Sequence, residues 1–242
     1  MPSHSPQYAI APDQAIPDGL RDAIERKRFR QQELKNRMEP ILCAAQHSVL
    51  EIGCGHGHWL TAYAEAHPTT TCIGLDIITQ RVSKSQLKAT KRQLNNLHFI
   101  KAEAIEFIEI LPPSVSFDWI MVLFPDPWPK KRHHRRRLIQ SSFLDLIHPF
   151  MTPEGKLCFR TDDDPYFSWA RDIIGNHPKW RLDEPTIWPF ECETLFQAMM
   201  DHWQSLSAGI TDGSQTDFSQ VLRHPADNCR WYKIPDIPPR KT

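Results

Sequence analysis

The chain has 242 residues, 40% of them hydrophobic, and its 29 basic residues balance its 29 acidic residues. This length and composition predict one globular unit with extensions rather than two full domains. The sequence has no run of about 18 apolar residues that would span a membrane, and residues 1–14 lack the basic-then-apolar order of a signal peptide. We therefore expect a cytoplasmic protein with no membrane partner.

The N-terminal part is expected to lie outside the main domain. Residues 1–17 contain several prolines and little apolar periodicity, which predicts a loose arm. From Asp18, a typical N-cap residue, apolar residues recur at helical spacing among many charges as far as residue 37. Arm and peripheral helix together form the expected N-terminal unit, residues 1–40.

Apolar, β-branched segments then alternate with amphipathic segments. The expected strands are residues 48–52, 70–75, 97–100, 117–124 and 156–161. The expected helices are residues 58–66, 79–94, 104–111, 138–150 and 165–174. Strict alternation implies right-handed crossovers and a mostly parallel sheet with helices on both faces, so the predicted fold class is α/β. Ligands of such folds bind at the carboxyl ends of the strands.

The pattern weakens after Trp180. One further helix is expected over residues 193–206, which closes the main domain of residues 41–206. Residues 207–220 are polar without strong periodicity, and residues 231–242 hold three prolines. We therefore interpret residues 207–242 as a C-terminal extension.

No metal site is predicted. The six cysteines form no Cys-x-x-Cys pair, and Cys72 and Cys158 lie in expected strands, which favours buried free thiols over metal ligands. The carboxylates in Thr161-Asp162-Asp163-Asp164 suit Mg²⁺. A strand-end turn with Asp164 as helix N-cap before Pro165 explains them without a metal.

The first expected strand runs into Glu51-Ile52-Gly53-Cys54-Gly55-His56-Gly57, an acid followed by glycines at every second position. Glycines permit a sharp turn and leave room for a ligand against the backbone. A dinucleotide fold prefers the spacing G-x-G-x-x-G, so this loop favours a cationic ligand without phosphates. Asp76 ends the next strand, where an acid can bind both hydroxyls of a ribose, and Glu103 follows the third, where it or its neighbouring backbone would touch an adenine. These residues resemble the cofactor half of class I S-adenosylmethionine-dependent methyltransferases; an ordinary turn between strand and helix, or an NAD site, is the alternative.

A stiff acidic loop follows the fourth strand, with the sequence Pro125-Asp126-Pro127-Trp128-Pro129-Lys130. Prolines fix φ and disfavour helix, so the Asp126 carboxylate is held in place at the strand end. Rigidity around an acid suggests a positioned catalytic group. Trp128 either stacks on a base or caps the loop.

Basic residues follow this loop at once. They are Lys130, Lys131, Arg132, Arg135, Arg136 and Arg137, with His133 and His134 between them. Such a run is often a solvated helix face. Beside a candidate site, in a chain that is neutral as a whole, it favours contacts with the phosphates of RNA.

The series F-P-D-P-W-P-K-K-R-H followed by R-R-R resembles the signature of the bacterial tRNA (guanine-N7-)-methyltransferase family, whose target is guanine 46 in the variable loop. The resemblance runs from about residue 48 to 167 and implies a Rossmann-like class I methyltransferase fold, S-adenosylmethionine as cofactor and tRNA as substrate. It implies cofactor contacts at Glu51, Gly53, Gly55, Gly57, Asp76 and Glu103, a catalytic acid at Asp126 and substrate contacts at Lys130, Asp162, Thr194 and Gln197. The implied RNA contacts are Arg132, His133, His134, Arg135, Arg136 and Arg137.

Two positions depart from the family pattern. Glu103 stands where the family usually has Asp, which keeps the carboxylate. Gln197 stands where the family motif Thr-x-Phe/Tyr-Glu, here Thr194-Leu195-Phe196-Gln197, has Glu, and an amide cannot supply negative charge. A catalytically silent tRNA-binding paralogue and a methyltransferase with another substrate therefore remain alternatives. We expect a monomer or homodimer with no obligate protein partner.

Overall fold

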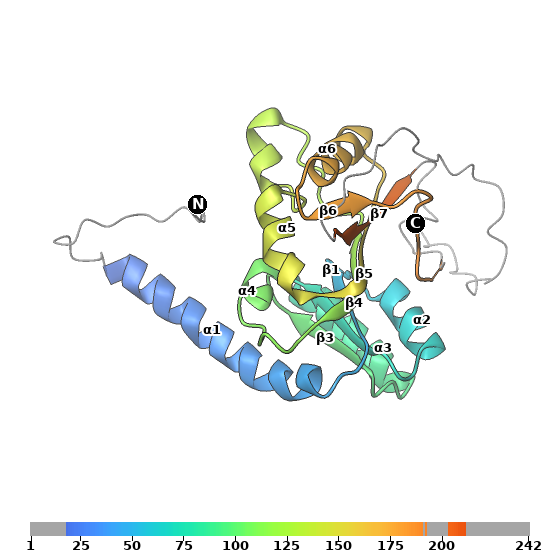
Figure 1. Ribbon diagram of the computed structural model, residues 1–242. Helices are drawn as coiled ribbons and strands as arrows, with labels where there is room; N and C mark the ends of the chain where they lie inside the picture. Colours follow the sequence, from blue (N-terminus) through green and yellow to red (C-terminus); the bar gives the residue numbers. More distant parts are fainter. Residues whose placement is uncertain (1–17, 191, 193–202, 212–242) are drawn as a thin grey trace, which may run out of the picture.

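The computed structural model describes residues 18–190, 192 and 203–211. A seven-stranded sheet lies at the centre, in the order β3-β2-β1-β4-β5-β7-β6 (Figure 1). The strands are β1 (Ser48–Ile52), β2 (Thr71–Asp76), β3 (Leu97–Lys101), β4 (Phe117–Leu123), β5 (Met151–Thr161), β6 (Trp180–Leu182) and β7 (Gln204–Ile210). The first five pair in parallel, whereas β7 is antiparallel to β5 and β6. The predicted α/β fold with a mostly parallel sheet is confirmed.

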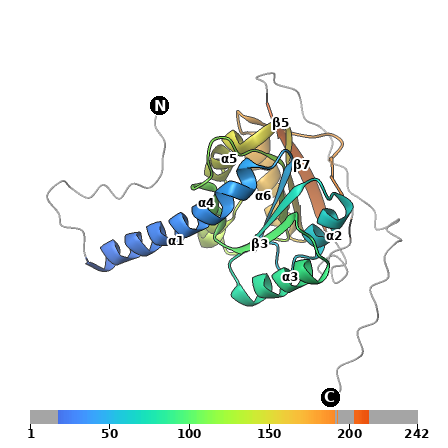
Figure 2. The same ribbon diagram turned by 90° about the horizontal axis from the view of Figure 1, so that it is seen from below.

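Helices follow the strands in alternation. They are α1 (Asp18–Cys43), α2 (His58–Ala66), α3 (Thr79–Lys91), α4 (Ala104–Ile108), α5 (Ser141–Ile147) and α6 (Asp164–Gly175), with 3₁₀ helices η1 (Lys131–Arg136) and η2 (His148–Phe150). Helices α2 and α3 share one hydrophobic cluster, and the end of α1 joins α4, α5 and α6 in the other. Figures 1 and 2 show these helices on the two faces of the sheet.

Neighbouring residues of the central strands enter different clusters. In β1, Val49 packs with α2 and α3, while Leu50 packs with the helices of the other face. In β4, Met121 likewise packs with α2 and α3, and Ile120 packs with the helices of the other face. Side chains of a strand alternate between faces, so a sheet covered on both sides needs an apolar residue at nearly every position. Burial of both faces of the sheet therefore explains the continuous apolar runs in the sequence.

Helix α1 is attached mainly by its C-terminal end. Met38 and Leu42 are buried, whereas Leu20 and Phe29 expose 44% and 66% of their surface. Figures 1 and 2 show the N-terminal half projecting away from the sheet. The helix was expected to end at residue 37 but continues to Cys43 with Pro40 inside it, because packing of Met38 and Leu42 holds its last turns.

The prediction of a helix over residues 193–206 is wrong for its last residues, 204–206. Residues 193–202 lie outside the described part, and Gln204–Ile210 forms strand β7, which crosses the expected boundary at residue 206. The hydrophobic pattern of β7 is weak because Ser207 is buried in it. Its hydroxyl donates to Asp183 Oδ2 at 2.8 Å and accepts from the Ile187 N–H at 2.8 Å, which satisfies a polar group inside the sheet.

Other expected boundaries moved as well: α3 ends at Lys91 rather than at residue 94, and α4 ends at Ile108 rather than at residue 111. Strand β5 begins at Met151 rather than at residue 156, and a register shift between Phe117 and Trp119 accommodates its irregular start, which contains Pro153 and Gly155. The helix expected over residues 138–150 begins only at Ser141 and ends as the 3₁₀ helix η2. Proline and glycine signals made the start of β5 resemble a turn.

Cys72 and Cys158 are buried in β2 and β5 and form no disulfide in the described part of the chain, as the sequence predicted. Cys54 in the glycine loop is also free and buried. Within the described ranges, no helix has the length and apolar character of a membrane span.

Candidate active site

Five of the predicted site carboxylates belong to five neighbouring parallel strands. In sheet order, Glu103 follows β3, Asp76 ends β2, Glu51 is the penultimate residue of β1, Asp126 follows β4 and Asp162 follows β5. Because parallel strands end at one edge of a sheet, the fold brings all five to the same edge. The expected cofactor residues occupy one half of this edge and the expected substrate residues the other.

The glycine loop makes the sharp turn between β1 and α2. Gly53, Gly55 and Gly57 have φ values of 74°, 55° and 64°, a region that L side chains rarely adopt. At Gly57 there is a second constraint, since a Cβ atom would lie 2.3 Å from Cζ of Phe99. The loop therefore needs glycine both for its backbone and for its close approach to β3.

Glu51 is a buried acid without a full set of partners. Its side chain accepts a hydrogen bond from the Leu60 backbone, but its Oε2 has no hydrogen-bond partner in the described part of the chain. Burial raises the pKa of Glu51 to about 8. A buried carboxylate oxygen of this kind suits a cationic ligand group, because an unpaired buried acceptor is costly.

Asp76 is held rigidly at the end of β2. Its Oδ1 accepts the Ile78 N–H at 2.7 Å, and the Arg81 guanidinium lies 3.7 Å from its Oδ2. Next to this acid, Ile77 exposes 67% of its surface, and Ile105, two residues past Glu103, exposes 41%. These apolar residues after neighbouring strands are candidate walls for a flat aromatic ligand. Sequence reasoning missed them, although an isoleucine one or two residues after a strand-end acid was the available signal.

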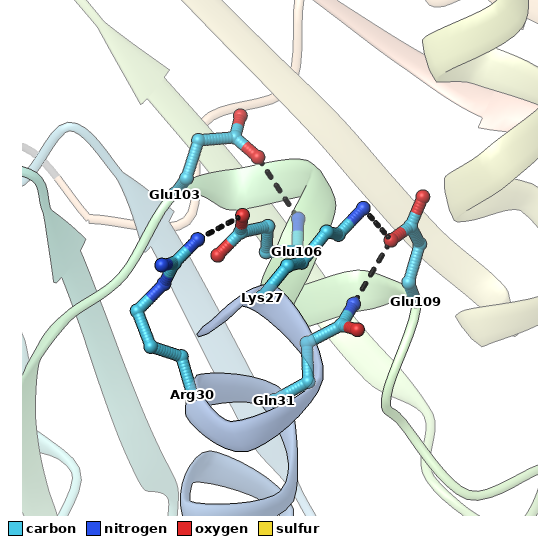
Figure 3. A network of polar contacts seen from close by, with 6 residues as sticks. All are labelled: Lys27, Arg30, Gln31, Glu103, Glu106 and Glu109. Carbon is cyan, nitrogen blue, oxygen red and sulfur yellow. Dashed lines mark hydrogen bonds and ion pairs between the residues drawn. The ribbon is translucent and has the colours of Figure 1, made fainter. Parts of the chain in front are cut away.

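Glu103 serves as the N-cap of α4. Its Oε2 accepts the backbone N–H of Glu106 at 2.9 Å (Figure 3). The same figure shows α1 docked on α4 through Lys27 and Gln31, which both donate to Glu109, and through Arg30, which donates to Glu106. One oxygen of the Glu103 carboxylate thus caps its own helix, so a ligand at this strand end can contact either the remaining acceptor positions or the neighbouring backbone.

The loop around Asp126 is strained at both ends. Phe124 and Trp128 have positive φ values of 49° and 47°. Such conformations cost about 1–3 kcal/mol each and persist only where the surrounding structure imposes them. Phe124 is fixed by its N–H, which donates to the Arg160 carbonyl at 2.8 Å. Asp126 lies between Phe124 and Trp128 in the loop, and its side chain is exposed.

The basic segment forms the 3₁₀ helix η1, which sequence reasoning did not predict. Lys130, Lys131, Arg132, Arg135 and Arg136 are exposed, while His133 and His134 are half-buried. The Arg136 guanidinium lies over the Trp128 ring, 4.9 Å from its centroid, and His133 meets that ring edge-on at 5.8 Å. Trp128 therefore contacts the basic segment of its own chain.

Arg137 differs from the other arginines of the segment. It is only 3% exposed, so the expectation that its side chain faces RNA does not fit the structure. Aromatic residues of α6 cover its guanidinium. The pattern of charges along the sequence cannot predict burial by residues that are distant in the chain.

Asp162 lies exposed at the end of β5, beside the Asp126 loop. The N-cap of α6 is Asp163, which accepts the Tyr166 N–H at 2.7 Å, and not Asp164 as expected. Asp164 instead lies in the first helical turn and accepts a hydrogen bond from Gln204. The expected substrate residues Thr194 and Gln197 lie outside the described residues.

Comparisons with known proteins identify the family and the fold. Residues 45–200 match the family described as "Putative methyltransferase". The tRNA (guanine-N(7)-)-methyltransferase of Chromohalobacter salexigens is 32% identical over 69% of this chain and 68% of its own length. The enzyme of the same name from Halorhodospira halophila is 38% identical over 52% of this chain and only 54% of its own length.

Solved structures resemble the fold. The aminoglycoside resistance methyltransferase NpmB1 is 17% identical, with a TM-score of 0.54 over 73% of this chain and 93% of its own. A 16S rRNA (adenine(1408)-N(1))-methyltransferase from Catenulisporales acidiphilia is 17% identical, with a TM-score of 0.50 over 75% and 93%. The fold is that of class I methyltransferases. By its sequence, this chain belongs to the tRNA (guanine-N(7)-)-methyltransferase family.

Proposed function

We propose that this protein transfers a methyl group from S-adenosylmethionine to N7 of a guanosine in tRNA, at position 46 of the variable loop. The observation that carries the proposal is the strained loop around Asp126, which stands between a cofactor-type glycine loop and an exposed basic segment. Family membership supports the same reaction.

The residues around the glycine loop fit this cofactor. The unpaired Oε2 of Glu51 suits the ammonium group of the methionine moiety, and Asp76 has lone pairs left for ribose hydroxyls. Ile77 and Ile105 are exposed where an adenine ring would lie flat between them. When bound, the cofactor supplies a methyl group activated by its sulfonium.

The substrate half of the edge needs no strong base. Guanine N7 has an exposed lone pair and no proton to lose, so the protein must place N7 in line with the methyl group and offset the positive charge that the purine gains. Asp126, together with Asp162, accepts hydrogen bonds from guanine N1–H and the 2-amino group and supplies that negative charge. Lys130, Thr194 and Gln197 are the further expected contacts of the guanosine.

The exposed basic segment binds the tRNA backbone in this proposal. Arg132, Arg135 and Arg136 contact phosphates, with His133 and His134 beside them, and this positions the RNA without reading its sequence. Trp128 is covered by Arg136, which supports a role as a cap of the loop rather than as a stacking platform. A tRNA substrate implies a cytoplasmic enzyme, and we expect a monomer or homodimer without an obligate protein partner.

Methyl transfer to an unmodified tRNA transcript, followed by nucleoside analysis, tests the proposal. It predicts 7-methylguanosine as the product. Binding of both S-adenosylhomocysteine and tRNA without transfer would instead identify a silent tRNA-binding paralogue, to which Gln197 in place of glutamate points. Cofactor binding without tRNA binding would identify a methyltransferase with another substrate.

A further inference from the structure

Arg137 is a buried cation directly after the exposed helix η1. Its Nε donates to the Pro127 carbonyl at 2.8 Å, and its Nη1 donates to the Pro165 carbonyl at 3.4 Å. Pro127 follows Asp126, and Pro165 is the second residue of α6, three residues after Asp162. One guanidinium therefore bridges the Asp126 loop (residues 124–128) and the first turn of α6, which follows the Asp162 turn (residues 162–163).

Aromatic side chains of α6 hold this guanidinium in place. Its Cζ lies 4.8 Å from the ring centroid of Tyr166 and 5.4 Å from that of Trp169. Both rings are fixed through Ile139, whose N–H donates to the Tyr166 hydroxyl at 3.2 Å and whose carbonyl accepts the Trp169 Nε1–H at 3.0 Å. Burial raises the pKa of Tyr166 to about 12, so the ring stays neutral beneath the cation.

The bridge ends where the loop backbone is strained. The Pro127 carbonyl belongs to the peptide unit that leads into Trp128, which has a φ of 47°. A strained conformation needs an external constraint, and the hydrogen bond from Arg137 supplies one. The Nη2 of Arg137 is buried without an acceptor among the described residues. The site thus tolerates the cost of one unsatisfied donor to keep the planar fork in this position.

We propose that Arg137 is a positioning residue: it ties the Asp126 loop to the start of α6, directly after the Asp162 turn, and so sets the relative position of the two acids, rather than contacting RNA. Lysine is expected to replace it poorly, because an ammonium group lacks both the fixed spacing of Nε and Nη1 and the flat guanidinium that contacts Tyr166 and Trp169. The role in catalysis rests on the proposed function, whereas the tie between the loop and α6 does not.

The kinetic test compares Arg137→Lys with Arg136→Gln, a change in the exposed neighbour. We expect Arg137→Lys to lower kcat by about 10- to 100-fold through misplacement of the acids, with unchanged tRNA affinity and an unchanged dependence of that affinity on salt. Arg136→Gln is expected to raise KM for tRNA and to reduce the salt slope by about 1. If Arg137→Lys instead raises KM for tRNA and reduces the salt slope, as expected for Arg136→Gln, Arg137 is an RNA contact and the proposal fails.

A second test does not depend on methyl transfer. Hydrogen exchange at the amides of Phe124, Asp126 and Trp128 is expected to be faster in Arg137→Lys than in the wild type, with S-adenosylhomocysteine still bound. Trp169→Phe keeps the cation but shrinks the ring beside it and removes the hydrogen bond to Ile139, and it is expected to change exchange in the same direction. If both variants exchange these amides at the wild-type rate, Arg137 does not hold the Asp126 loop in place and the inference fails. If the wild-type protein does not methylate tRNA, only the proposed function fails.

Discussion

The carboxylate of Asp76 accepts a hydrogen bond from the backbone N–H of Gly55, with 3.0 Å between the nitrogen and Oδ2. The other oxygen of the same carboxylate binds the start of α3 through Ile78. One buried acid at the end of β2 thus braces the glycine loop that follows β1. It can keep this bond and still accept from a ligand, because a carboxylate has about four acceptor positions.

Asp76→Asn is expected to weaken cofactor binding. The amide has only one acceptor atom, so either the glycine loop or α3 loses its partner, and a hydrogen bond to a charged group contributes about 1.5–3 kcal/mol. This corresponds to a Kd for S-adenosylhomocysteine raised by about 10- to 100-fold, measured by titration calorimetry. Asp118→Asn is the matched control, because Asp118 also accepts a backbone N–H, that of Ser48, at the far end of the sheet. Equal losses in both variants would contradict the assignment.

Glu51 makes the stability of the cofactor-free protein depend on pH. Its pKa is raised by burial from 4.5 to about 8, so between these values the folded state keeps a proton that the unfolded state has released. The free energy of unfolding therefore falls as pH rises through this window. Glu51→Gln removes this fall, which urea unfolding at pH 6 and pH 8.5 would detect. Glu25→Gln, at an exposed glutamate of α1, is expected to keep the wild-type slope, and a wild-type slope in Glu51→Gln would refute the buried-acid account.

Gly57→Ala is expected to destabilise the fold more than Gly53→Ala. Both positions have positive φ, which costs an L residue about 1–2 kcal/mol. Only at Gly57 does the added methyl group also meet a ring, Phe99, whereas at Gly53 no atom lies within 4 Å of the new Cβ. Thermal unfolding of the two variants measures the difference, and equal melting temperatures would show that the contact with Phe99 relaxes freely.

Asp126→Asn is expected to lower kcat by about 10²–10³-fold, the range found when one electrostatic stabiliser of a transition state is removed. Binding of S-adenosylhomocysteine and tRNA should persist, because Asp126 lies exposed outside the glycine loop and the basic segment. Asp172→Asn, at an exposed aspartate of α6, serves as the control. Full activity in Asp126→Asn with intact cofactor binding would remove the basis of the mechanism.

Regular elements buried on both sides were predictable from the sequence. The bounds of β1 and α2 agree with the expected residues 48–52 and 58–66, because apolar runs and glycine signals mark both of their ends. The order of acids along the sheet edge follows from the same alternation of strands and helices. The sequence was sufficient to predict these features because residues that are adjacent in the chain determine them.

Tertiary contacts decided the features that the sequence did not predict. Strand β7 was missed because Ser207 is satisfied by Asp183 and Ile187, which are distant in sequence. Arg137 resembles its exposed neighbours in charge, but Tyr166 and Trp169 bury it from about 30 residues away. Asp163 rather than Asp164 caps α6, a difference of one residue that depends on where β5 ends.

Mapping the methylated base in tRNA tests the central claim most directly. Unmodified tRNA incubated with the protein and labelled S-adenosylmethionine would be treated with borohydride and aniline, which cleave the chain at 7-methylguanosine. The proposed function predicts label incorporation and a single cleavage at guanosine 46 of the variable loop. Incorporation without cleavage, or cleavage at another position, would contradict it.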